Sequence, residues 1–421
     1  MSLTLSRIMS ISLNSQIFIG TAAGVLLGLG FAYLGTDTTI SQRGIFLCGL
    51  IGNLFIDLLK MLLVPLVFTS IAVGVANLRI HQQMHRVWLS TLAFFALSMA
   101  LAILLGLTAA NLFEPGKGLN LDLFHDAISG FEAKQMSLAD FIARFFRGIF
   151  VNPFAALAQA NVLAIVIFAL LLGIALVLGG ERYKNILILL QEGLELILQM
   201  VAWIMRLAPL GIMALLAQLV ALQNVALLGS LAKFVAVVIA TTLLHGFVLL
   251  PLVLFMVTRK SPIDFFKGAR EAMITAFATS SSSATLPISL RCAEQHLHVK
   301  PEIAGFVIPL GATLNMDGTA LYEATAALFI ANLAGVDLNL AQQFIVLFTA
   351  MMASIGAPGI PSAGMVTMVL VLQSVGLPVE AIAILLPIDR LLDTFRTMVN
   401  VEGDMIGSLV VQHFTYGKKS R

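Results

Sequence analysis

The last apolar segment of the chain carries a face of charged and amide side chains that could bind a ligand. Its members recur every three or four residues, which places them on one side of a helix; they are Asp389, Asp393, Thr397, Asn400 and Asp404, with Arg396 bordering them. An arginine presents a planar fork that matches a carboxylate, and charged groups within membrane segments mark ligand or ion sites by default. We interpret this face as a site for an anionic ligand and cations. An Arg396–Asp393 ion pair that only supports the fold is the alternative.

Three other apolar stretches are interrupted by polar residues, glycine or proline. They are 279–287, with the sequence TSSSSATLP, 311–319, with GATLNMDGT, and 354–364, with SIGAPGIPSAG. Backbone that is not helical is tolerated at membrane depth only where it is buried in protein or lines a wet cavity. The hydroxyls and amides of the first stretch suit an anionic ligand, and the carbonyls and Asp317 of the second suit a small cation. The alternatives are a serine linker, a structural kink and a short external loop, respectively.

The composition is that of a membrane protein. Of the 421 residues, 59% are hydrophobic and only 11% are charged, and the formal net charge is +2. A typical soluble domain carries about 25% charged residues. These values exclude a soluble enzyme, a nucleic-acid-binding protein, a disulfide-rich secreted protein and a disordered chain. The two cysteines, Cys48 and Cys292, form neither a disulfide framework nor a zinc pattern.

Eight apolar runs are long enough to cross a bilayer as helices; they lie near 15–36, 45–77, 88–113, 152–180, 186–222, 226–257, 303–334 and 376–411. Eight crossings that start in the cytoplasm leave most basic loop residues on the cytoplasmic side, as the positive-inside rule requires. That bias holds only if 262–292 and 338–371 are re-entrant. We therefore predict an all-α membrane protein with eight transmembrane helices and two re-entrant helical hairpins, in the plasma (inner) membrane, with both termini in the cytoplasm.

The chain also divides into two similar halves. Each half has a polar-tipped hairpin followed by a helix with Asn and Asp, and the predicted topology opens the two hairpins from opposite sides. This is the pattern of an inverted repeat, in which substrate and ion sites lie where the tips meet.

Together these motifs resemble the glutamate transporter family, the dicarboxylate/amino acid:cation symporters. The resemblance rests on NMDGT at 315–319, the serine-rich tip, the Gly-Ile-Pro tip and the spacing of Asp393, Arg396, Thr397, Asn400 and Asp404. It implies a homotrimer of elevator type, in which a transport domain moves against a scaffold domain. The implied division is 1–86 for scaffold helices 1 and 2, 87–115 for helix 3 of the transport domain, 116–150 for an extracellular loop, 151–225 for scaffold helices 4 and 5, and 226–421 for the transport domain core.

The resemblance implies a substrate site on the charged face and the two tips. Asp393 would bind the amino group of the substrate, and Arg396 would bind its side-chain carboxylate. The other implied contacts come from Ser280, Ser282, Thr319, Ile360, Gly364, Thr397 and Asn400.

The resemblance also implies Na⁺ sites built from oxygen atoms. One would combine the carboxylate of Asp404 with carbonyl groups of Gly311, Asn315 and Asn400, and another would use carbonyl groups of Thr313, Ser354, Ile355 and Ala357. A third family site draws on Asp317, Asn315 and helix 3. There this chain offers the hydroxyl of Ser98, but Phe95 and Met99 supply no hard oxygen, so we expect that site to be altered.

Three further charged residues call for an interpretation. Glu323 lies in an apolar run where the ionised form is costly, and proton-coupled relatives carry a Glu there; we predict a proton carrier, with a hydrogen-bonded structural acid as the alternative. Some family members have a second arginine where this chain has Ser280 or Thr394, and Arg390 lies one turn from Thr394. For Glu402 we expect a lipid-facing or paired position.

The sequence therefore predicts a secondary active symporter that imports glutamate or aspartate with Na⁺, H⁺ or both, without a cofactor or nucleic acid. A C4-dicarboxylate or neutral amino acid symporter is the alternative. An intramembrane protease is disfavoured because Val401 replaces the first glycine of a GxGD motif. A channel would need a symmetric filter. His81 and His85 fit a solvated loop better than a metal site.

Overall fold

The computed structural model describes residues 13–76, 85–118, 150–159, 162–221, 225–355, 359 and 362–417. This part of the chain is helical and contains no strand. The predicted all-α class is therefore confirmed. Most of the predicted 116–150 loop, His81 and both chain ends lie outside the described residues.

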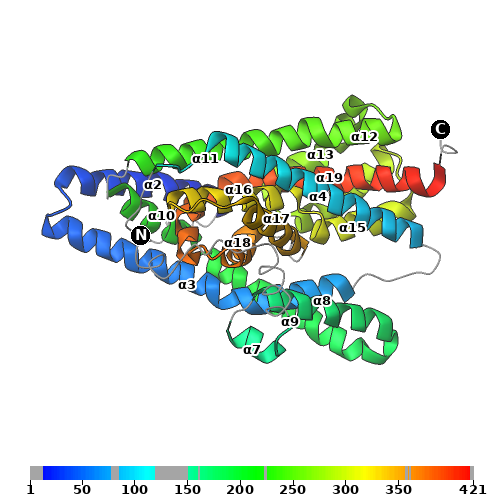
Figure 1. Cartoon of the computed structure of the whole chain (residues 1–421), viewed down its shortest axis with the longest axis horizontal. Coiled ribbons are helices and arrows are strands. Elements are labelled where there is room, and N and C mark those ends of the chain that lie inside the picture. The colour runs from blue at the N-terminus through cyan, green and yellow to red at the C-terminus, as the bar shows by residue number, and fades with distance from the viewer. Residues whose placement is uncertain are drawn as a thin grey trace, which may run out of the picture.

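One group of helices comes from the N-terminal half and contains α2 (Leu13–Leu34), α3 (Thr39–Ala76), α7 (Pro153–Ala158), α8 (Val162–Gly179), a 3₁₀ turn (Gly180–Tyr183), α9 (Lys184–Met205) and α10 (Ala208–Ala221). Helix α3 packs against α8, α9 and α10, and α2 packs against α10. Figure 1 shows α2 and α10 together at the end opposite the C-terminus.

Glycines bring α2 and α10 into close contact. Gly20, Gly24 and Gly28 recur every four residues, and an ideal Cβ there would lie 2.4, 2.5 and 2.6 Å from atoms of α10. Small residues at this spacing let membrane helices approach each other closely.

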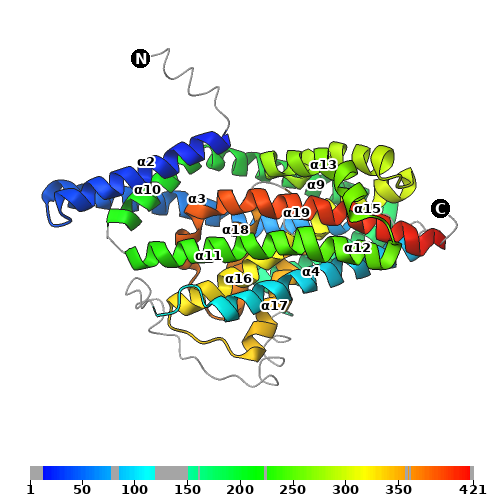
Figure 2. The ribbon, with the colours of Figure 1, turned by 90° about the horizontal axis from the view of Figure 1, so that it is seen from above.

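The second group surrounds the C-terminal helix. It contains α4 (His85–Phe113), α11 (Val225–Leu244), a π turn (His245–Leu249), α12 (Leu250–Thr258), α13 (Pro262–Thr279), α14 (Ser282–Arg291), a second π turn (Cys292–His296), α15 (Pro301–Leu314), α16 (Asp317–Leu333), α17 (Leu340–Ile355), α18 (Ala363–Ser374), a 3₁₀ turn (Val379–Ala381) and α19 (Ile382–Tyr416). Helix α19 contacts α4, α11 to α16 and α18. Figure 2 shows it running along much of the molecule.

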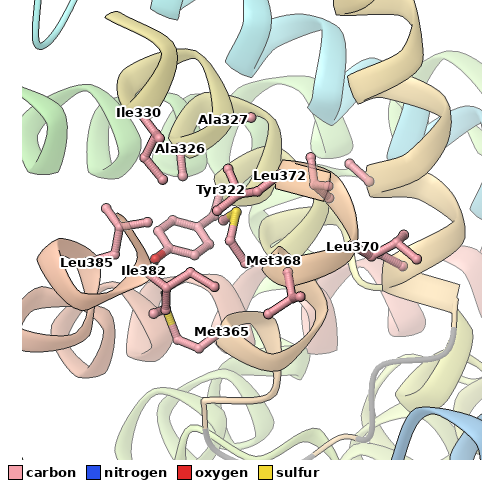
Figure 3. Packing of buried hydrophobic residues seen from close by; sticks show 14 of the residues in the cluster. Tyr322, Ala326, Ala327, Ile330, Met365, Met368, Leu370, Leu372, Ile382 and Leu385 are labelled. Carbon is pink, nitrogen blue, oxygen red and sulfur yellow. Dashed lines mark hydrogen bonds between the residues drawn. The ribbon is translucent and has the colours of Figure 1, made fainter. Parts of the chain in front are cut away.

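Helix α16 is buried along nearly its whole length, between α4, α11, α17, α18 and α19. Its Tyr322 points toward Met365 and Ile382 in the core (Figure 3), and the Tyr322 hydroxyl donates to Met365 Sδ at 3.2 Å. A helix that is buried on every side in this way lies in the interior of a helical bundle.

Four described stretches are both long and apolar enough to span a membrane: Ser15–Leu34, Arg86–Phe113, Ile167–Met205 and Gly229–Thr258. Several other predicted spans are not single long apolar helices in the structure, for physical reasons. Arg206 and Leu207 separate α9 from α10, and non-helical Asn315 and Met316 separate α15 from α16. Helix α19 has 35 residues, but the charged face interrupts its apolar character.

Candidate functional site

The two predicted tips touch each other in the structure. Helices α13 and α14 form one hairpin, and α17 and α18 form the other. The Ser281 hydroxyl donates to the carbonyl oxygen of Gly359 at 2.7 Å, and the Ser283 amide donates to the same oxygen at 3.1 Å. The sequence-based expectation that the tips meet therefore agrees with these contacts.

Backbone conformation shapes the first tip. Helix α13 ends at Thr279, and the next residue, Ser280, has the left-handed angles φ 51° and ψ 37°. The Ser281 hydroxyl caps α14 by accepting a hydrogen bond from the amide of Ala284 at 3.1 Å. Ser280 and Ser282 are both buried there. The Ser280 Oγ atom has no hydrogen-bond partner among the described residues. In the second tip, Ala357 and Ile360 lie outside the described residues.

Arg396 is fully buried on α19 and pairs with two carboxylates. Its Nη2 atom donates to Asp389 Oδ1 and to Asp393 Oδ1, both at 2.8 Å, and its guanidinium lies 4.1 Å from the centre of the Tyr322 ring. The ion pair with Asp393, left open as a structural alternative, is thus present. It uses only one of the three guanidinium nitrogens.

The other edge of this guanidinium faces residues expected in the substrate site. The Nε and Nη1 atoms of Arg396 have no hydrogen-bond partner in the described part of the chain. An ideal Cβ at Gly364 would lie 3.5 Å from Nη1 and 2.9 Å from Thr319 Cγ2. A buried donor without a partner costs about 1–3 kcal/mol, so this edge is suited to a carboxylate that arrives with a ligand.

Asp393 connects α19 with the second hairpin. Its Oδ2 atom accepts the backbone amide of Ser362 at 2.8 Å and lies 3.4 Å from Arg390 Nη1. Ser362 has a left-handed φ of 60°. Asn400 accepts the Gly318 amide at 2.8 Å, and its Nδ2 lies 3.4 Å from Thr319 Oγ1.

Most of the expected substrate residues are therefore close to one another. Thr397 is buried on the same helix as Asp393, Arg396 and Asn400. The structure joins that face to Thr319 on α16 and to Gly364 on α18, while the first tip contacts Gly359 of the second tip.

The residues of the first expected cation site are adjacent. Asn315 Nδ2 donates to Asp404 Oδ1 at 3.1 Å, and an ideal Cβ at Gly311 would lie 2.2 Å from that same oxygen. Asn315 Oδ1 has no partner among the described residues. Carboxylate, amide and carbonyl oxygens are hard ligands, so this set fits Na⁺.

The second expected cation set is only partly described, because one of its members, Ala357, lies outside the described residues. Thr313 hydrogen bonds back to the Leu310 carbonyl at 3.0 Å. Ile355 is the last residue of α17, and Ser354 is buried one residue before it.

The third expected cation set contains a histidine that the sequence analysis missed. Asp317 Oδ2 accepts a hydrogen bond from Ser98 and lies 3.0 Å from His245 Nε2, while Asp317 Oδ1 has no partner among the described residues. His245 opens the π turn after α11. In the sequence its only signal is that of a lone polar residue in an apolar run. Phe95 and Met99 are buried, as their types suggest.

Glu323 connects α16 with both helices of the second hairpin. The Thr367 hydroxyl donates to Glu323 Oε1, and Ser354 Oγ lies 3.4 Å from Oε2. These contacts fit the structural alternative, and they also place the acid where hairpin movement would change its surroundings.

Glu402 corrects an expectation. It is fully buried, and neither carboxylate oxygen has a partner in the described chain. The lipid-facing position is therefore wrong, and the described residues contain no hydrogen-bond partner for the paired position. An ideal Cβ at Gly246 would lie 3.0 Å from Glu402 Oε2, so the acid packs against the π turn.

Comparison with known proteins supplies the identity of this arrangement. The model of the sodium:dicarboxylate symporter family matches residues 13–414. The chain belongs to this family. As a symporter family member it is a membrane transport protein and not an enzyme.

Three relatives illustrate the range of the symporter family. Excitatory amino acid transporter 4 of Mus musculus is 33% identical, with 94% of this chain and 82% of the relative covered. Excitatory amino acid transporter 3 of Homo sapiens is 32% identical, with 95% and 85% covered. Neutral amino acid transporter B(0) of Bos taurus is 34% identical, with 94% and 79% covered.

Proposed function

We propose that the chain is a secondary active symporter that imports glutamate or aspartate together with Na⁺. The observation that carries this proposal is the buried guanidinium of Arg396, whose Nε and Nη1 atoms have no partner among the described residues and whose Nη1 lies beside Gly364. A side-chain carboxylate of the substrate satisfies that edge with two parallel charge-assisted hydrogen bonds.

The remaining groups bind the amino-acid part of the substrate. The carboxylate of Asp393 accepts hydrogen bonds from the substrate ammonium, next to Thr397 and Asn400. The first tip at Ser280 and Ser282 and the second tip at Ile360 and Gly364 cover the substrate from two sides.

The coupling ions bind at the sets of oxygen ligands. Na⁺ is held by Asp404 with Gly311, Asn315 and Asn400, and a second Na⁺ by Thr313, Ser354, Ile355 and Ala357. Ser98 and Asp317 contribute an altered third set. Cations at the Asp404 and Asp317 sets offset buried negative charge that would otherwise be costly.

The Asp404 set gives a direct prediction. Asp404→Asn removes the carboxylate but keeps the shape, so the Na⁺ concentration for half-maximal transport is expected to rise about tenfold, consistent with the loss of one charged ligand. Uptake measured across a Na⁺ titration checks this. Asp264→Asn, at an exposed carboxylate near the start of α13, serves as the control. An unchanged Na⁺ requirement in Asp404→Asn would contradict the assignment.

Glu323 is the proposed proton carrier. Glu323→Gln mimics the protonated acid, so it is expected to keep substrate exchange but lose the increase of net uptake at low external pH. Exchange and net uptake are compared between external pH 5.5 and 8.0 in the same proteoliposomes. If the variant keeps the pH dependence of wild type, Glu323 carries no proton.

We further propose how the protein works in the membrane. The chain crosses the inner membrane eight times with cytoplasmic termini, and the two hairpins are re-entrant. Residues 1–86 and 151–225 form a scaffold, and 87–115 with 226–421 form a transport domain that moves as an elevator within a homotrimer. Helices within each set pack mainly against one another, which supports this division.

The neutral amino acid relative keeps a second candidate open, because Asp393 suits any zwitterion. A C4-dicarboxylate is a third, because Arg396 suits any carboxylate. Radiolabelled aspartate uptake into proteoliposomes, with Na⁺ and pH gradients imposed separately and alanine and succinate as competitors, distinguishes them. Uptake insensitive to both gradients would refute the symporter proposal.

A further inference from the structure

Four charged side chains form a compact buried group on α19. They are Asp389, Arg390, Asp393 and Arg396, and none is more than 5% exposed. Two arginines and two aspartates give the group no net formal charge. In a protein interior, an uncompensated charge is far more costly than a balanced set. The net charge of this group therefore affects how readily it accepts a charged ligand.

Arg396 alone cannot balance the group. Its Nη2 atom is shared between the carboxylates of Asp389 and Asp393. Without a second cation, one guanidinium would face two carboxylates, and the group would carry a net charge of −1. A substrate carboxylate arriving at the Nε and Nη1 edge would then enter a region of excess negative charge.

Arg390 supplies the second cation. Its Nη1 atom lies 3.4 Å from Asp393 Oδ2, the oxygen that does not contact Arg396. The two arginines therefore approach opposite oxygens of the same carboxylate. Glu323, an acid on the neighbouring helix α16, is neutral in the loaded protein under the proton-carrier proposal and leaves this balance unchanged.

We propose that Arg390 is a specificity-determining residue that favours acidic over neutral substrates. It balances the second aspartate, and this leaves the charge of Arg396 available to a substrate carboxylate. Arg390 acts through the electrostatics of the group as a positioning residue and does not itself bind the substrate. The inference rests on the proposed function, because it assumes that an acidic amino acid binds at Arg396.

The test compares aspartate with asparagine, which has the same shape but an uncharged amide. Inhibition constants for both are measured against radiolabelled aspartate in proteoliposomes at saturating Na⁺. For Arg390→Met, the aspartate constant is expected to rise on the order of tenfold, since one buried unit charge is lost nearby, while the asparagine constant changes little. Arg390→Lys keeps the charge and should retain most of the preference for aspartate.

A double variant separates charge balance from packing. Asp389→Asn together with Arg390→Met again leaves one arginine and one aspartate, so most of the aspartate affinity should return. Arg291→Met, at an exposed ion-paired arginine, is the control. If thermal unfolding shows that Arg390→Met does not fold, the aspartate and asparagine constants of the double variant and of Arg390→Lys are compared with those of wild type instead.

Equal losses for both ligands, or no recovery in the double variant, would overturn the proposal. Failure of the proposed function is a different result, because wild-type protein would then not accumulate aspartate at all.

Discussion

Replacing Arg396 with cysteine is expected to remove high-affinity recognition of acidic amino acids and to make neutral amino acids the better substrates. Two charge-assisted hydrogen bonds to the substrate are lost, and bonds of this kind contribute about 1.5–3 kcal/mol each. The affinity for aspartate should therefore fall by about two orders of magnitude or more. The carboxylate of Asp393 stays available for the substrate ammonium. Inhibition constants for aspartate, serine and alanine measure the change in preference.

The Arg396 variant also breaks a buried ion pair, which needs a control. Loss of one partner of such a pair costs about 3–5 kcal/mol, so the thermal unfolding temperature is expected to fall as well. Arg291→Cys removes an arginine that is paired with Glu271 but exposed, and it should alter neither preference nor stability substantially. Retained aspartate affinity in a folded Arg396→Cys protein would contradict the role assigned to this residue.

Replacing Gly359 with alanine is expected to prevent the two tips from closing and to reduce uptake at least about tenfold. The added Cβ would lie 2.6 Å from Ser283 Oγ and 2.8 Å from the carbonyl oxygen of Ala312. The carbonyl belongs to the backbone and cannot rotate away, and overpacking of this kind costs about 1–3 kcal/mol. Initial uptake rates and aspartate affinity measure the effect.

Gly193→Ala is the matched control for the tip variant, because nothing lies within 4 Å of a Cβ at that position. It should transport like wild type. The Gly359 variant is expected to fold, since the tip lies between helices rather than inside one. Normal transport by a folded Gly359→Ala protein would show that the contact between the tips is not required.

The periodicity of the sequence predicted the charged face of α19 well, because helical spacing alone decides which residues share a face. The polar residues and glycines of 311–319 predicted an interruption of the apolar run, and the structure places it at Asn315 and Met316. The serine and glycine tips were predicted from composition, and the structure brings Ser281 and Ser283 to Gly359.

Contacts between distant segments could not be predicted in the same way. Asp389 was visible on the charged face, but its pairing with Arg396 depends on side-chain conformation. His245 meets Asp317 where a π turn begins, and periodicity does not report such a turn. The burial of Glu402 depends on the packing of Gly246 from another helix.

Apolar length also gave an incomplete account of the spans. A window average cannot distinguish one long helix from two shorter ones, as at Arg206 and Leu207. The charged residues of α19 also lower its average hydropathy, although they are buried inside the protein and not exposed to lipid.

Aspartate binding to the purified protein at graded Na⁺ concentrations tests most directly whether Arg396 and the oxygen sets form one coupled site. Aspartate affinity is expected to rise steeply with Na⁺, and Arg396→Cys is expected to lose aspartate binding across the titration. Aspartate binding that is independent of Na⁺, or unaffected by Arg396→Cys, would contradict a coupled site.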